Sequence, residues 1–144
     1  MTRGSSRVLA ALLTVLAACG DGPAGPEDDV LVGQFGHAEI PMELLATHAG
    51  VTLDLWCGAF FVSEEAAILD ADQTFELEGQ YRPGGFVIDG EIDATVSGTL
   101  ERMNFVDVVT VTLSIERGDP AADPLVISLR RGQEFEGDPQ PCPA

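Results

Sequence analysis

The stretch IDGEIDATVSGTL, residues 88–100, alternates apolar or glycine residues with polar residues at every position. A period of two places successive side chains on opposite faces of a β-strand, so the pattern predicts one long strand with one buried face. Gly90 and Gly98 fall on the buried face, where missing side chains allow a sheet to bend sharply. A long strand that bends favours a barrel or a strongly coiled sandwich over a flat sheet.

The same alternation recurs on both sides of this stretch. It predicts further strands over residues 51–57, 74–81, 109–116 and 125–129. Turn-forming residues separate them at 70–73, 82–85 and 118–124, and a less regular turn is expected within 102–106. Short connections between consecutive strands predict an all-β domain, a small antiparallel meander barrel of seven to nine strands, with a β-sandwich as the alternative.

The first 18 residues have the layout of a secretory signal peptide. Arg3 and Arg7 precede an apolar run from Val8 to Ala18. Eleven helical residues span roughly 16 Å, about half the hydrocarbon thickness of a bilayer, so this run is too short for a membrane-spanning helix.

The end of this run, Leu16-Ala17-Ala18-Cys19, resembles a bacterial lipobox. The resemblance implies that the Cys19 thiol receives a diacylglyceryl group, that residues 1–18 are removed and that the new amino terminus is acylated, for example with palmitate. The alternative is an ordinary secreted protein that keeps Cys19 for a disulfide. Gly20 after the cysteine implies, by the enteric sorting rule, an outer-membrane location if the organism has that membrane.

The acylated Cys19 opens a short tether. Residues 19–29 are rich in Gly, Pro and acids and hold no large apolar residue, so we expect a flexible segment with a reach of roughly 15 to 20 Å. Apolar residues become frequent from Val30, and residues 30–144 suit a single β domain.

The cysteine count supports an exported protein. The chain has three cysteines, and lipidation of Cys19 leaves Cys57 and Cys142 as a pair. We expect these two to form a disulfide, since such bonds persist outside the cytosol. Cys57 is expected at the end of the strand that begins at Val51.

The charge excludes some partner classes. Residues 19–144 keep five of the seven Arg, no Lys and all 24 acids, a formal net charge of −19. Such a surface repels nucleic acid, so we expect no nucleic-acid partner and an attachment to the membrane through the N-terminal lipid.

Catalytic and metal-binding motifs are absent from the sequence. It has no Gly-x-Ser-x-Gly, no His-Glu-x-x-His, no phosphate-binding glycine loop and no Lys. The two histidines, His37 and His48, lack a ligand spacing, and the acidic run from Asp70 to Glu76 departs from a calcium loop and predicts a polar turn. We therefore expect no catalytic residues, no metal and no cofactor.

Three aromatic residues form the candidate binding patch: Trp56, Phe60 and Phe61. Trp56 falls on the polar face of its predicted strand. Phe60 and Phe61 are adjacent, so they point to opposite faces and leave one of them exposed.

The body resembles uncharacterised small β-barrel lipoproteins. The shared features are Trp56-Cys57, residues 72–75 with Gly79-x-Tyr81, Ser97-Gly98, residues 129–132 and Pro141-Cys142. The resemblance implies a fold and no activity. The sequence thus predicts a lipid-anchored protein of the cell envelope, a non-enzymatic binding or structural module for a small apolar ligand or an envelope protein; an acid-based hydrolytic enzyme is the alternative.

Overall fold

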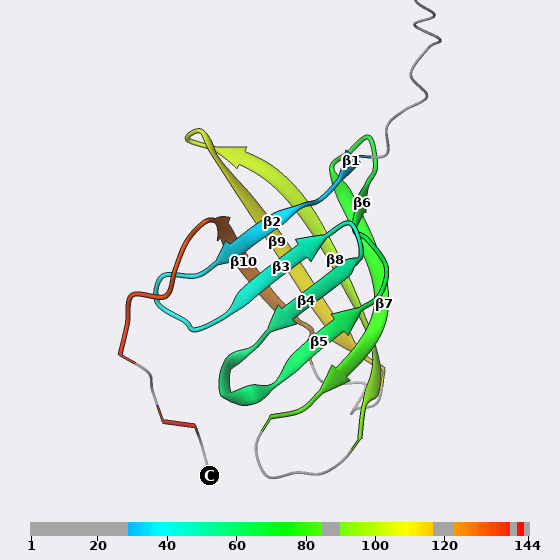
Figure 1. The fold of residues 1–144 in the computed structure, drawn as a ribbon, viewed down its shortest axis with the longest axis vertical. Helices are drawn as coiled ribbons and strands as arrows, with labels where there is room; N and C mark the ends of the chain where they lie inside the picture. Colours follow the sequence, from blue (N-terminus) through cyan, green and yellow to red (C-terminus); the bar gives the residue numbers. More distant parts are fainter. Residues whose placement is uncertain (1–28, 85–89, 117–122, 139–140, 143–144) are drawn as a thin grey trace, which may run out of the picture.

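The chain folds into a closed β-barrel with a small cap (Figure 1). The computed structural model describes residues 29–84, 90–116, 123–138 and 141–142. Within this part of the chain, eight antiparallel strands close in the order β10-β2-β3-β4-β5-β7-β8-β9, while β1 and β6 pair separately. The elements are β1 (Asp29–Val30), β2 (Gly33–Gly36), β3 (Glu43–Thr47), β4 (Gly50–Asp54), η1 (Trp56–Gly58), β5 (Phe60–Ser63), β6 (Ile68–Leu69), β7 (Thr74–Arg82), β8 (Ile92–Met103), β9 (Val106–Ile115) and β10 (Leu125–Arg131). The prediction of an all-β antiparallel barrel is confirmed, and the sandwich alternative is excluded.

The decisive stretch forms most of β8, but its predicted bounds are shifted. The strand is 12 residues long and begins at Ile92, opposite Tyr81 near the end of β7. Gly90 is exposed and precedes the strand, so its predicted inward position is wrong, and Ile88 and Asp89 lie outside the described residues. At the other end, β8 continues past Leu100 to Met103 because β9 pairs with it up to Val106.

The interior of the barrel is filled by apolar side chains. The inward positions of the strands supply a continuous core, whose largest fully buried members include Phe35, Phe61, Leu44, Leu53 and Leu129. An eight-stranded barrel has an interior just wide enough for such a filling. The alternation read from the sequence is therefore the alternation between this core and the outer surface.

Two glycines on inward positions make room for aromatic rings. Gly98 lies directly opposite Phe75, and a Cβ at Gly98 would overlap the Phe75 ring. A Cβ at Gly79 would likewise overlap the ring of Phe61 and the backbone oxygen of Val62. Each glycine thus leaves space for a phenylalanine ring from a neighbouring strand inside the barrel.

The β1–β6 pair covers one end of the barrel, the upper end in Figure 1. The backbone N–H of Leu31 donates to the Ala67 carbonyl at 2.8 Å, and Leu31, Ala67 and Leu69 are buried in the barrel core. The first described residue, Asp29, begins β1. The start of the domain is therefore fixed to this end.

Arg131 reinforces the seam where β10 meets β2. Its Nε donates to Asp107 Oδ2 at 2.9 Å, and its Nη1 donates to the Val32 carbonyl at 2.7 Å. The guanidinium carbon also lies 4.6 Å from the centre of the Phe35 ring. One side chain therefore joins β9, β10 and the start of β2.

Candidate functional site

The predicted aromatic patch is not formed as expected. Phe61 is fully buried in the barrel core, so it is not available to a surface patch with Trp56 and Phe60. Phe60 lies on the outer face of β5, half-buried, with the Arg82 guanidinium 5.3 Å from its ring centre. Alternation correctly placed the two phenylalanines on opposite faces, but the arginine that lies over Phe60 comes from β7, which pairs with β5.

Trp56 and Cys57 leave the strand in which they were predicted. β4 ends at Asp54, and residues 56–58 form the 3₁₀ helix η1, with Cys57 at φ 66°. Because that backbone conformation is incompatible with an extended strand, Cys57 does not end the strand from Val51. Trp56 lies half-buried in the connection to β5.

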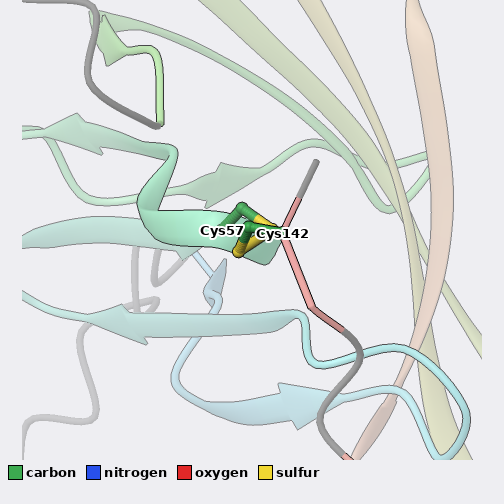
Figure 2. The surroundings of a disulfide bond; sticks show 2 residues. All are labelled: Cys57 and Cys142. Atoms are coloured by element: carbon green, nitrogen blue, oxygen red, sulfur yellow. A yellow bond between two sulfur atoms is a disulfide. The ribbon is translucent and has the colours of Figure 1, made fainter. Parts of the chain in front are cut away.

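Cys57 and Cys142 form the predicted disulfide (Figure 2). Their Cα atoms are 5.4 Å apart, inside the range that disulfides require. The bond joins η1 to the chain end that follows β10. Among the three cysteines this leaves Cys19, which with Leu16, Ala17 and Ala18 lies outside the described residues.

The two histidines lie at opposite ends of β3. His37 precedes that strand, and its Nδ1 accepts hydrogen bonds from the backbone N–H groups of Glu39 at 3.1 Å and Ile40 at 3.2 Å. His48 follows β3 in the exposed turn to β4. Within the described residues, no three His, Cys, Asp or Glu side chains gather in a group that could hold a metal ion.

The acidic run from Asp70 to Glu76 forms a turn organised by one carboxylate. Asp70 Oδ1 accepts from the backbone N–H groups of Asp72 at 3.0 Å and Thr74 at 2.8 Å, and Oδ2 accepts from the Thr74 hydroxyl at 2.6 Å. The hydrogen bonds from Thr74 hold the pKa of Asp70 below its usual value. This exposed carboxylate is kept ionised, the opposite of what a general acid needs.

A groove of about 480 Å³ lies on the outer face of β7, β8 and β9. Hydroxyl groups and two carboxylates dominate its walls: Thr74, Ser97, Thr99, Thr110, Thr112, Asp70 and Glu76. The sheet register places Thr74, Thr99, Thr110 and Ser128 in one row across four strands, and the Thr110 and Ser128 hydroxyls are 3.0 Å apart. The groove therefore offers a regular array of hydrogen-bond donors and acceptors to a polar partner.

Sequence reasoning missed this row although its residues were visible as the polar half of the alternation. The missing information was the register, since a shift of one strand by two residues would place the hydroxyls in different rows.

The turn between β8 and β9 was expected within residues 102–106 and is confirmed, but the exposure of its phenylalanine was missed. Asn104 and Phe105 connect Met103 to Val106, and the Phe105 side chain is 92% exposed. The apolar alternation ends at Leu100 and resumes at Val109, so it gave no signal for side-chain exposure within the turn.

Comparisons with known proteins give no relative: no family model, no curated protein and no solved structure matches this chain. In the part of the chain that the structure describes, no helix has the length and apolar character needed to cross a membrane.

Proposed function

We propose that this protein is a lipid-anchored protein of the cell envelope whose barrel acts as a non-enzymatic binding or structural module. The observation that carries the proposal is the Cys57–Cys142 disulfide. It accounts for two of the three cysteines and leaves Cys19, within Leu16-Ala17-Ala18-Cys19, for lipid attachment. A disulfide also agrees with a protein that folds outside the cytosol.

The barrel supports a binding role on its outer surface. The core side chains, with Phe35 and Phe61 among the largest, fill the interior where a small apolar ligand would otherwise lie. The hydroxyl-lined groove over β7, β8 and β9 is the hollow best suited to a partner, because its threonine and serine hydroxyls both donate and accept hydrogen bonds. An envelope protein or polymer that presents amide or hydroxyl groups matches this chemistry.

The anchor is tested by Cys19→Ser. We expect the variant to accumulate as an uncleaved precursor or to appear in the soluble fraction, while the wild-type protein carries acyl chains on Cys19 by mass spectrometry of its amino-terminal peptide. A processed Cys19→Ser protein that stays in the membrane fraction, or a wild-type Cys19 without lipid, refutes the anchor.

The binding surface is tested by a photo-crosslinking residue at Thr112, in the groove, and a matched one at Leu45, which is exposed on β3. In native envelopes we expect a defined crosslinked species from position 112 and none from position 45. Equal labelling at both positions, or none at either, refutes the groove as the binding surface.

A further inference from the structure

The β8–β9 turn presents two apolar side chains to solvent. Phe105 is 92% exposed and Met103 is 51% exposed, the first at the tip and the second at the last position of β8. Neither belongs to the core cluster that fills the barrel. Fold stability therefore does not account for a phenylalanine at this position.

The backbone of the turn makes the phenylalanine more unusual. Asn104 has φ 50° and Phe105 has φ 67°, and the two residues join strands paired at Met103 and Val106. Positive φ at both central positions defines a type I′ turn, which favours Asn followed by Gly and disfavours a bulky side chain. A strained residue with an exposed ring points to a function at the tip.

The tip lies at the end of the barrel where the domain begins. Figure 1 shows the β8–β9 turn and β1 in the upper part of the molecule, on opposite sides of it. Arg131 links the two regions, since it pairs with Asp107, two residues after Phe105, and donates to the carbonyl of Val32, three residues after Asp29. Asp29 in turn follows Cys19 by ten residues.

The charge near the tip departs from that of the whole chain. Three of the five arginines in residues 19–144 lie near the tip: Arg102, Arg130 and Arg131. In the sheet register Arg102 is opposite Asp107 and Arg130 is opposite Val108, and Arg131 follows Arg130. The carboxylates close to them include Glu101, Asp107, which is paired with Arg131, and Glu39, which lines one hollow with Met103 and Arg130. Arg102 and Arg130 are exposed and match the phosphate groups of a phospholipid surface.

We propose that the β8–β9 turn inserts Phe105 and Met103 into the interface of a phospholipid membrane beside the acylated Cys19. The inference rests on the proposed function. A tether of ten residues reaches roughly 15 to 20 Å, so the anchor keeps this end of the barrel close to the lipid headgroups. Aromatic side chains favour that interface, and a weak second contact is sufficient when the lipid already holds the protein there.

The test places a fluorescent reporter at the tip of the full-length, lipidated protein. The chain has one tryptophan, so Phe105→Trp in a Trp56→Phe background gives a single signal from the turn. The protein is reconstituted into vesicles of phosphatidylethanolamine and phosphatidylglycerol with brominated acyl chains. We expect blue-shifted emission and at least a twofold loss of intensity relative to vesicles without bromine.

The matched control is Val126→Trp in the same background. Val126 is 60% exposed but lies at the start of β10, opposite Thr112 and away from the tip. Its emission is expected to stay water-like and unquenched. Circular dichroism of both variants verifies that the barrel is intact.

Mass spectrometry of Cys19 on the same sample separates the two proposals. Acylated Cys19 with water-like, unquenched emission from position 105 overturns the insertion and leaves the anchor standing. Unacylated Cys19 overturns both. A third outcome also overturns the insertion. If the emission from position 105 is blue-shifted in native envelopes but stays unquenched in the brominated vesicles, the turn contacts a protein partner instead of lipid.

Discussion

Gly98 and Phe75 offer a direct test of how the barrel interior is packed. The two residues face each other across β8 and β7, and the Phe75 ring occupies the space that a side chain at position 98 would need. Phe75 is buried, so its ring cannot move out to solvent. Gly98→Ala should therefore overpack the core and destabilise the protein by about 1 to 3 kcal/mol.

Phe75→Ala alone removes a buried ring and should cost about 3 to 5 kcal/mol. In the double variant, the new methyl group at position 98 enters the space left by the ring, so the cost of Gly98→Ala should fall close to zero. The two changes should thus be coupled by about 1 to 3 kcal/mol. That is a measurable part of a total stability on the order of 5 to 15 kcal/mol.

The assay is urea unfolding of the four proteins with the disulfide intact, followed by Trp56 fluorescence and circular dichroism. Gly79→Ala combined with Phe75→Ala is the matched control, because Gly79 makes room for Phe61 instead. The control pair should be additive within about 0.5 kcal/mol. Additive costs for Gly98→Ala and Phe75→Ala, or a neutral Gly98→Ala, would refute the proposed packing.

Four further outcomes are expected. Replacing both Cys57 and Cys142 with Ser should lower stability by up to about 4 to 5 kcal/mol by loop entropy, since the bond spans 85 residues, and reduction of the wild-type protein should match it in urea unfolding. Arg131→Ala should cost about 1 to 3 kcal/mol through the lost ion pair, backbone hydrogen bond and contact with Phe35, whereas exposed Arg130→Ala should change stability by less than about 0.5 kcal/mol. The pKa of Asp70 is lowered in the folded state, so the ionised carboxylate should stabilise the fold above about pH 4 and lose this effect as the pH falls through the pKa of the folded state. The difference in unfolding free energy between wild type and Asp70→Asn should therefore close in acid, and a constant difference contradicts this. Phe105→Gly should raise stability by about 1 kcal/mol in thermal unfolding by relieving the positive φ, and an unchanged or lower midpoint argues against strain at the tip.

The alternation of apolar and polar residues was sufficient to predict the fold class. Residues 94–100 and 109–113 lie in the faces expected of them, because a half-buried strand imposes a period of two on its sequence, whereas Ile115 at the end of β9 is exposed. The same rule failed at Trp56 and Cys57, where local turn geometry ends the strand without any Gly or Pro before Gly58. The alternation of side chains indicates which face of a strand is buried, but it does not indicate where the backbone leaves the sheet.

The surface features were harder to predict because they depend on which strands are neighbours. Phe60 is half-covered by Arg82 from β7, and the hydroxyl row needs the register of four strands at once. Phe105 escaped notice for a different reason. A turn was expected within residues 102–106, but an Asn-Phe pair gives only half of the usual signal for the two central residues, so the position of Phe105 at the tip was not predicted.

The seam between β2 and β10 joins segments from the two ends of the domain. It is paired at Arg130–Gly36 and Arg131–Phe35, whereas β8 and β9 pair from Ala94–Ile115 to Met103–Val106. Closing the barrel therefore depends on a short, long-range contact that forms after the local hairpins, and amide hydrogen exchange should be faster along this seam than in the β8–β9 ladder. A chain that emerges amino terminus first has to wait for β10 before its barrel can close, so intermediates with an open sheet edge precede the closed barrel.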